Sequence, residues 1–301
     1  MIEEDIPQPE PDAGELLIRV YAAGVTPTEL LWYPTSHTKT GKGRSHAVPA
    51  HEFSGIVAAI GRDVNNFSPG EEIYGMNDWF SEGALAEFCI TQSSSVAPKP
   101  QGLTHAEAAS VPIGALTAWQ GLFDRAKLQP GERLLVHGSA GAVGVYVVQL
   151  ARNCGAHIIA TASARNLKFV SALGANQVID YKAEKFEEVV QNIDVIFDAV
   201  GGDTLARSWK VLRPGGRLVT IAATSEQALD DRVKHSFFIV EPNRKQLEKI
   251  GEMLQMGKLR AFVDAVVPFS QASTAYTGEV KQRLGYGKMA VSIVAEKSAI
   301  A

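Results

Sequence analysis

The sequence predicts an α/β protein in which a doubly wound parallel sheet is joined to a second domain built mainly of β-strands. Short apolar strands alternate with helical segments through the middle of the chain, which is the pattern of a parallel sheet covered by helices. The first third reads mostly as strands separated by Gly, Pro and Asn turns, and a strand pattern returns near the end. We therefore expect residues 1–108, completed by 262–301, to form one domain and residues 109–261 to form the other.

Length and composition fit a globular protein and exclude several classes of function. The chain has 301 residues, long enough for two domains, of which 46% are hydrophobic and 21% charged. A net charge of −4 gives no reason to expect nucleic acid, and no apolar run approaches the ~18 residues that cross a bilayer. The acidic start has no apolar segment after it, which argues against a signal peptide. We expect a cytoplasmic protein that binds neither nucleic acid nor a membrane.

The first part of the chain alternates predicted strands with turns and contains one long polar loop. The loop lies between Tyr33 and Pro49, and loops of this length are often functional or mobile. The expected strands are Glu15–Tyr21, Phe53–Ile60, Ile73–Gly75 and Ala84–Thr91.

The middle of the chain contains five expected strands with four helices between them. The strands are Leu134–Val136, His157–Thr161, Gln177–Ile179, Val195–Phe197 and Arg217–Ile221. The helices are Ala142–Asn153, Asn166–Leu173, Glu184–Gln191 and Thr204–Val211. Gly155 and Gly174 follow two of these helices, where a left-handed residue is favoured. Pro242 is then expected to open a further helix, and Phe262–Val294 to return to a strand, a helix and a strand.

A glycine-rich turn joins the first of the middle strands to its helix and predicts a nucleotide site. The run Gly138–Gly144 (GSAGAVG) places Gly141 and Gly144 at the second and third glycines of G-x-G-x-x-G, with Ser139 at the first. Free N–H groups at a helix start and the helix dipole both favour phosphate oxygens. The alternative is a tight strand–helix turn without a ligand. The flanking strand and helix favour a dinucleotide pyrophosphate, and hence a Rossmann domain.

The segment after the second middle strand favours NADP(H) over NAD(H). A NAD site usually has a carboxylate about 20 residues past the glycines, where it holds the ribose 2′-hydroxyl. This chain has no Asp or Glu from Arg133 through Ile179, and the corresponding place holds Ser163 and Arg165. A hydroxyl and a guanidinium suit a 2′-phosphate. A solvent-facing loop that merely lacks acidic residues is the alternative interpretation.

No motif for a metal or a nucleophile accompanies the glycine turn. Zinc catalysis needs three protein ligands and an open fourth position, and His51 has no cysteine near it in the sequence. We favour a hydrogen-bonded structural role for His51 and assign no metal ligand. Cys89 and Cys154 are expected to be buried apolar residues. Tyr33 is an equal candidate for packing or for lining a substrate cleft.

Five runs along the chain carry a more specific signal. They are Ala22–Glu29 (AAGVTPTE), His51–Val57 (HEFSGIV), Val136–Gly144 (VHGSAGAVG), Phe197–Gly202 (FDAVGG) and Leu212–Val219 (LRPGGRLV). Together they resemble the medium-chain dehydrogenase/reductase superfamily, in its zinc-independent quinone oxidoreductase-like branch, over nearly the whole chain.

The resemblance implies a GroES-like β domain, a Rossmann domain, and NADPH-dependent reduction of a quinone or an α,β-unsaturated carbonyl. Relatives are commonly dimers, so we expect a homodimer whose partner is a small-molecule carbonyl or quinone. By the same resemblance, Ser163, Arg165 and Tyr181 would take the 2′-phosphate of NADP(H). The full set that it assigns to cofactor binding is Thr117, Ser139, Ala140, Gly141, Ala142, Val143, Gly144, Ser163, Arg165, Tyr181, Val200, Phe238, Val240, Gly287 and Lys288.

The chain departs from zinc-dependent relatives at the positions of two zinc ligands. Thr26 stands where those relatives have a cysteine, and Pro112 or Ile113 stands where another ligand falls. Thr26 and Tyr33 are the candidate catalytic residues, as proton donors to the carbonyl oxygen. Two alternatives stay open: a zinc-dependent alcohol dehydrogenase that uses His51, and a non-catalytic NADPH-binding sensor protein.

Overall fold

The computed structural model describes residues 1–44, 46–222, 225 and 230–294, and the chain forms two compact units. The first unit consists of Met1–Ile113, Pro242–Leu284 and the chain from Lys288 onward. The second consists of Gly114–Glu241 together with the three residues Gly285–Gly287. The last part of the expected 262–301 segment, residues 295–301, lies outside the described residues.

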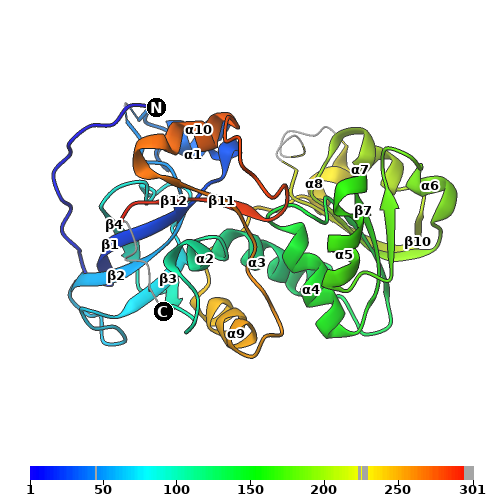
Figure 1. Ribbon diagram of the computed structural model, residues 1–301, viewed down its shortest axis with the longest axis horizontal. Helices are drawn as coiled ribbons and strands as arrows, with labels where there is room; N and C mark the ends of the chain where they lie inside the picture. Colours follow the sequence, from blue (N-terminus) through cyan, green and yellow to red (C-terminus); the bar gives the residue numbers. More distant parts are fainter. Residues whose placement is uncertain (45, 223–224, 226–229, 295–301) are drawn as a thin grey trace. The chain divides into compact units, whose positions relative to one another are not determined.

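The second unit contains a five-stranded parallel sheet (Figure 1). Its strand order is β10 (Leu212–Thr220), β9 (Ile193–Asp198), β6 (Arg133–His137), β7 (His157–Ala162) and β8 (Gln177–Asp180). The chain runs outward from β6 to β8 and then returns to the other side of β6 at β9. The predicted doubly wound sheet is confirmed, and the strand order reverses between β6 and β9, which is where such sheets bind ligands.

Helices between the strands complete the core of this unit. Alternate strand residues, Leu135, Ile159 and Ile196, pack with Phe186 and Leu205 from two of the helices. Gly155 ends α4 in the left-handed region with a φ of 83°, as the glycine pattern predicts. The helical segments are α3 (Pro112–Trp119), η2 (Gln120–Arg125), α4 (Gly144–Cys154), η3 (Ala164–Asn166), α5 (Leu167–Leu173), α6 (Phe186–Val189), α7 (Gly202–Ser208) and α8 (Asp231–Ser236).

The first unit contains a seven-stranded sheet, in which the end of the chain pairs with its beginning. The sheet order is β11 (Val263–Pro268), β12 (Lys288–Ser292), β1 (Glu15–Gly24), β2 (Glu52–Ile60), β3 (Glu72–Met76) and β5 (Val96–Pro98), with β4 (Phe88–Gln92) also pairing with β1. Ile18, Phe53 and Ile73 are fully buried in its core. The antiparallel pairing of Ala23 with Val291 brings β12 beside β1.

The helices of the first unit include one that the sequence pattern had grouped with the second domain. This helix, α9 (Arg244–Gln255), begins after Asn243, whose side chain accepts a hydrogen bond from the backbone N–H of Gln246 at 3.1 Å. The expected first residue, Pro242, therefore lies before the cap. The Tyr74 hydroxyl donates to the carbonyl oxygen of Leu247 at 2.6 Å and ties α9 to the β-sheet.

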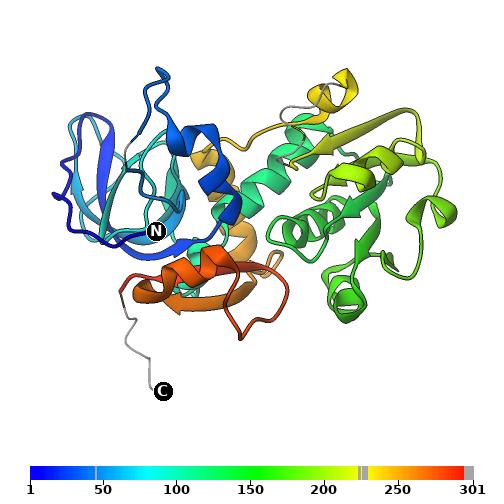
Figure 2. The same ribbon diagram turned by 90° about the horizontal axis from the view of Figure 1, so that it is seen from above.

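Short helices occupy the rest of the first unit, and α10 packs against β11 and β12 (Figure 2). The predicted polar loop after Tyr33 begins with one helical turn. None of the described helices is long and apolar enough to cross a membrane. The remaining helical segments are η1 (Pro27–Leu31), α1 (Tyr33–Ser36), α2 (His105–Ala109), η5 (Phe269–Gln271) and α10 (Ala272–Thr277).

Candidate functional site

A cavity of about 590 Å³ lies at the carboxyl ends of the parallel strands in the second unit. Segments that follow all five strands line it, and the Gly138–Gly144 turn after β6 forms one of its walls. The position agrees with the strand-order reversal between β6 and β9. Ten of the residues predicted to bind a cofactor line this cavity: Ser139, Ala140, Gly141, Ala142, Val143, Gly144, Ser163, Arg165, Tyr181 and Val200.

The glycine turn brings the start of α4 very close to the end of β6. A Cβ atom on Gly144 would lie 2.2 Å from the carbonyl oxygen of Gly138 and 2.6 Å from the Cα atom of Ser139. Gly138 itself has a φ of 77°, which is in the left-handed region. Val143 at the N-cap provides no side-chain cap. The N–H groups of Val145 and Tyr146 already donate to backbone carbonyl oxygens. Within the described residues, the N–H groups of residues 142–144 are the ones left to donate to the oxygens of a ligand phosphate.

A short segment from near the end of the chain contacts the glycine turn. Gly287 forms a β-bridge with Gly141, and its N–H donates to the carbonyl oxygen of Ala140 at 2.9 Å. Gly285 lines the cavity, whereas Lys288 does not. Gly287 therefore lies beside the predicted phosphate-binding turn, although more than a hundred residues separate them in the sequence.

Ser163, Arg165 and Tyr181 lie around the part of the cavity that follows β7 and β8. Arg165 is exposed and makes no hydrogen bond or ion pair within the described part of the chain. Its guanidinium is therefore available to an anionic ligand. Glu184, which sequence reasoning did not single out, also lines the cavity and is exposed. It follows β8 and not β7, and examining the carboxyl end of every strand would have found it.

His137 is a buried, neutral residue of the same cavity. Its side chain is 1% exposed and lies between the hydroxyl oxygens of Thr161, at 3.0 Å, and Ser208, at 3.1 Å. Burial and the nearby charge of Arg207 lower the pKa of the His137 imidazole to about 3. The Ser208 hydroxyl donates to the carbonyl oxygen of Thr204, so it accepts from Nε2–H of the histidine. The ring is held in one neutral tautomer and is no acid at neutral pH.

Three further predicted cofactor residues are buried in the second unit and do not line the cavity. Thr117, Phe238 and Val240 have exposed fractions of 4%, 5% and 6%. Arg125 lies over the Phe238 ring, 5.6 Å from its centroid. Side chains this deeply buried are typical of residues that pack in a core, and their roles in cofactor binding stay predictions.

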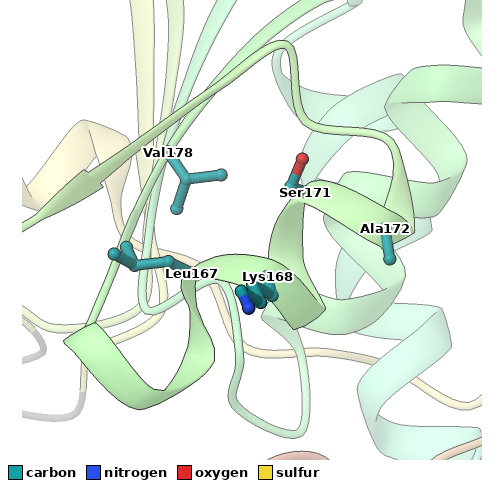
Figure 3. Close-up of a pocket in the computed structure, with 5 residues that line it drawn as sticks. All are labelled: Leu167, Lys168, Ser171, Ala172 and Val178. Carbon is teal, nitrogen blue, oxygen red and sulfur yellow. The ribbon is translucent and has the colours of Figure 1, made fainter.

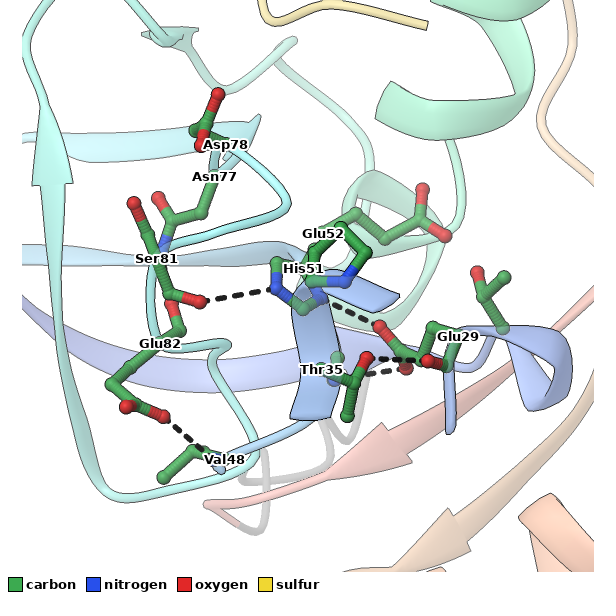
Figure 4. Close-up of polar contacts among 12 residues, drawn as sticks. Glu29, Thr35, Val48, His51, Glu52, Asn77, Asp78, Ser81 and Glu82 are labelled. Atoms are coloured by element: carbon green, nitrogen blue, oxygen red, sulfur yellow. Dashed lines mark hydrogen bonds and ion pairs between the residues drawn. The ribbon is translucent and has the colours of Figure 1, made fainter. Parts of the chain in front are cut away.

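In the first unit, His51 belongs to a buried hydrogen-bonded cluster (Figure 4). The Glu29 carboxylate is fully buried and accepts from the Ala50 N–H at 3.0 Å, the His51 ring at 2.6 Å and the Tyr276 hydroxyl at 2.7 Å. The other His51 nitrogen, Nε2, faces the carbonyl oxygen of Ser81 at 3.2 Å. Burial and the Glu29 charge raise the pKa of Tyr276. The cluster ties four segments of this unit together.

The residues around His51 do not fit a zinc site. A zinc ligand needs a free lone pair, but both nitrogens of the His51 ring face oxygen acceptors. Among the described residues, no group of three or more His, Cys, Asp or Glu side chains could hold a metal ion. Cys89 lies buried in β4, and burial raises the pKa of its thiol, which disfavours the thiolate that binds metals. We therefore derive no step that involves a metal.

Lys288, predicted to close the cofactor site, is instead buried in the first unit with its side chain 5% exposed. Its ammonium forms an ion pair with the fully buried Glu52 and donates to the Thr26 hydroxyl at 2.9 Å. The other carboxylate oxygen of Glu52 accepts from the Ile113 N–H at 2.8 Å. Burial raises the pKa of the Glu52 carboxyl, and the Lys288 charge opposes that effect. The half-buried Thr26 hydroxyl is thus in contact with the buried Lys288 ammonium.

Tyr33, the other candidate catalytic residue, has no such support. Its side chain is 54% exposed, and its ring stacks on that of His37 with the centroids 4.2 Å apart. The geometry favours Thr26 over Tyr33 as a polarised hydroxyl.

A second cavity of about 530 Å³ is lined by residues of α5 and β8 (Figure 3). Only Lys168 and Ser171 bring polar groups to it, beside Leu167, Ala172 and Val178. These groups do not converge on a point where a ligand could be held. We assign it no role.

We expect His137 to make the stability of the protein depend on pH. Because its pKa is about 3 in the folded protein and an imidazole in water has its ordinary value of 6.5, the unfolded chain binds more protons between those values. The stabilisation is complete above about pH 6.5 and is lost as the pH falls toward 3. The variant His137→Asn should lower the slope of unfolding free energy against pH by up to about 1.4 kcal/mol per unit.

Urea denaturation between about pH 4 and pH 6 measures this slope. The same measurement on the wild type gives the reference slope for His137→Asn. Equal slopes for wild type and His137→Asn would contradict the assignment of a neutral, buried imidazole.

We also expect Lys288 and Glu52 to be strongly coupled. The variant Lys288→Met leaves the Glu52 carboxylate buried without its cation, which should lower the free energy of unfolding by about 3–5 kcal/mol. Adding Glu52→Gln should restore most of that loss, because the glutamine oxygen can still accept from Ile113. Urea denaturation of the single and double variants measures the coupling. A double variant no more stable than Lys288→Met would disprove it.

Comparison with known proteins agrees with this two-unit architecture. The family of alcohol dehydrogenase GroES-like domains matches residues 12–101, and the zinc-binding dehydrogenase family matches residues 173–291. The chain is 34% identical to a probable mitochondrial zinc-binding oxidoreductase of Arthroderma benhamiae, over 96% of this chain and 91% of the relative. It is 30% identical to a chloroplastic NADPH-dependent alkenal/one oxidoreductase of Arabidopsis thaliana, over 92% of this chain and 72% of the relative.

The solved structure of a quinone oxidoreductase from Coxiella burnetii has the same fold. The two superimpose with a TM-score of 0.85 at 29% identity, over 97% of this chain and 94% of the other. The predicted combination of a GroES-like domain with a Rossmann sheet is thereby confirmed. Since both domain families match in this order, the chain belongs to the medium-chain dehydrogenase/reductase superfamily, and it is an oxidoreductase that uses a nicotinamide cofactor.

Proposed function

We propose that this oxidoreductase is NADPH-dependent and passes a hydride to a quinone or an α,β-unsaturated carbonyl without the help of zinc. The observation that carries the proposal is the exposed guanidinium of Arg165, which follows β7 beside Ser163 in the cavity behind the glycine turn. In NAD sites, a carboxylate occupies the end of this second strand. A cation there attracts the 2′-phosphate that distinguishes NADPH.

The strength of a hydrogen bond between a guanidinium and a phosphate is large enough to make the protein prefer NADPH to NADH. A hydrogen bond to a charged group contributes about 1.5–3 kcal/mol, which is roughly a 10- to 150-fold change in affinity. Arg165 forms no ion pair within the described chain, so no such contact has to break when a phosphate binds. Glu184 supplies the one acidic side chain near it in the cavity lining, but it follows β8 and is exposed, so solvent screens its charge.

The names of similar proteins support the substrate class. Relatives include the alkenal/one oxidoreductase of Arabidopsis thaliana and a 2-methylene-furan-3-one reductase of Solanum lycopersicum, and a neighbouring structure is a quinone oxidoreductase. The acceptors in these names share a carbonyl conjugated to a carbon–carbon double bond. Such acceptors take hydride at carbon while negative charge develops on the carbonyl oxygen.

The chain's own residues bind the cofactor and stabilise that developing charge. When bound, the reduced nicotinamide supplies the hydride. The N–H groups of residues 142–144 would hold the pyrophosphate, and Arg165 and Ser163 would hold the 2′-phosphate. The Thr26 hydroxyl, which accepts from the Lys288 ammonium, is free to donate its own proton toward the carbonyl oxygen. Tyr33 is the second candidate donor.

Zinc chemistry and a sensor role are the competing functions. The matched dehydrogenase family is described as zinc-binding, but the donor set at His51 does not suit the metal. No feature of the cavity favours a sensor over an enzyme. A cytoplasmic location and a homodimer stay predictions, and relatives include proteins named as mitochondrial and chloroplastic.

A turnover screen tests the proposed function. We expect the purified protein to oxidise NADPH with quinones or enones, and chelator to leave the rate unchanged. Activity that disappears with chelator and returns with zinc would favour the alcohol dehydrogenase. Tight NADPH binding without oxidation by any quinone, enone or aldehyde would favour the sensor.

We expect Arg165→Ala to act on one cofactor and not on the other. Loss of the guanidinium should raise the KM for NADPH by about 10- to 100-fold, because a charge-assisted contact to the 2′-phosphate disappears. The KM for NADH should change by less than about twofold, since NADH lacks that phosphate. Steady-state kinetics with a fixed acceptor measures both.

Lys168 provides the matched control for the Arg165 variant. It is an exposed cation three residues further on, and it faces the other cavity (Figure 3). Lys168→Ala should leave both KM values near those of the wild type. Equal increases for NADPH and NADH in Arg165→Ala would rule out the 2′-phosphate assignment.

A further inference from the structure

We propose that Gly285 is a specificity-determining residue, because it supplies the surface that holds the Arg165 guanidinium in place for the ribose 2′-phosphate of NADPH. This inference rests on the proposed NADPH dependence. It adds a residue some 120 positions further along the chain.

The segment Gly285–Gly287 is anchored firmly to the second unit. The Asn166 side-chain amide donates to the carbonyl oxygen of Gly285 at 3.0 Å. The Gly287 N–H donates to the glycine turn at Ala140, at 2.9 Å. Between them, the Tyr286 ring stacks on Phe169 of α5, with centroids 3.8 Å apart and planes 19° apart. The backbone at Gly285 is thus fixed by contacts on both sides.

Arg165 occupies the space that a side chain at position 285 would need. A Cβ atom on Gly285 would lie 2.8 Å from Cζ and Nη2 of Arg165 and 3.1 Å from its Nη1. The guanidinium therefore lies directly against the Gly285 backbone. Gly285 also has a φ of 84°, a backbone conformation that glycine adopts readily.

This packing replaces the ionic contacts that usually position an arginine. Arg165 has no hydrogen-bond acceptor or carboxylate within the described residues, so no ion pair fixes its rotamer. A surface that restricts the guanidinium before the ligand arrives reduces the entropy lost on binding. The restriction benefits only a ligand that contacts the guanidinium, and the 2′-phosphate is the part of NADPH that NADH lacks.

A methyl group at position 285 should therefore displace Arg165, and it also adds the backbone strain that a side chain carries at a φ of 84°. The atoms that it would meet belong to the free end of a flexible side chain and not to the backbone. We expect Gly285→Ala to weaken NADPH binding by about tenfold, the equivalent of ordering one long side chain again. The dissociation constant for NADH should change by less than about twofold.

Gly131 is the matched control for strain in the backbone. It has a φ of 82°, belongs to the same unit, and nothing lies within 4 Å of a Cβ atom placed on it. Gly131→Ala should carry the same conformational strain and leave both dissociation constants unchanged. Titration of cofactor fluorescence gives the constants, and thermal unfolding compares the stability of the two variants.

The double variant Gly285→Ala/Arg165→Ala tests whether Gly285 acts through Arg165. In the Arg165→Ala background, adding Gly285→Ala should not weaken NADPH binding further. If Gly285→Ala fails to fold, Tyr286→Ala removes the stacking on Phe169 and should show the same selective loss of NADPH.

The outcomes separate this inference from the proposed function. A wild-type protein that binds NADPH and NADH equally would overturn the NADPH dependence and the inference with it. A wild type that prefers NADPH, with Gly285→Ala keeping that preference or losing both cofactors equally, would overturn the role of Gly285 alone. Additive losses in the double variant would also overturn it.

Discussion

Arg165 presents a guanidinium at the carboxyl end of β7 with no anionic partner in the described chain, and the proposed preference for NADPH depends on that single charge. The parallel sheet makes the charge useful. Its strand order brings the segments after β6, β7 and β9 to one edge, so the glycine turn and Arg165 face the same cavity. In the proposed binding mode, the glycine turn would bind the pyrophosphate of NADPH and Arg165 would bind its 2′-phosphate.

At Gly144 in the glycine turn and at Gly285, a neighbouring group occupies the space that a side chain would need. At Gly144, the absent side chain lets α4 approach the end of β6, and the neighbours that a Cβ atom would meet are backbone atoms that cannot move. At Gly285, the neighbours are the end of the Arg165 side chain, which can. A substitution at Gly144 therefore clashes with fixed backbone, whereas one at Gly285 displaces a charged side chain and adds the backbone strain of a positive φ.

The first unit contains two buried charged clusters, one around Glu29 and one around Glu52. Glu29 collects donors from Ala50, His51 and Tyr276, and Glu52 is paired with Lys288. Each cluster joins segments that are far apart in the sequence. Thr26 lies half-exposed beside the Lys288 ammonium, which is the arrangement that the proposed hydroxyl donor to a carbonyl oxygen needs.

Local sequence patterns predicted the sheet and the glycine turn, because strand alternation and turn chemistry are short-range properties. They could not decide which sheet α9 would cover, since the apolar stripe with Leu247 and Ile250 fits either one. They also missed Glu184 and Gly285, whose relevance comes from contacts across the fold. The family resemblance assigned cofactor contacts to both Gly287 and Lys288. Gly287 lies at the glycine turn and Lys288 is buried beside Glu52, and both cofactor contacts stay predictions.

Calorimetric titration with adenosine 2′,5′-bisphosphate and with adenosine 5′-monophosphate tests the contact between Arg165 and the 2′-phosphate most directly. The two ligands differ only in the 2′-phosphate and need neither hydride transfer nor an acceptor. We expect the bisphosphate to bind at least about tenfold more tightly, with an advantage that shrinks as salt is added. Equal affinities at low salt would contradict a 2′-phosphate site at Arg165.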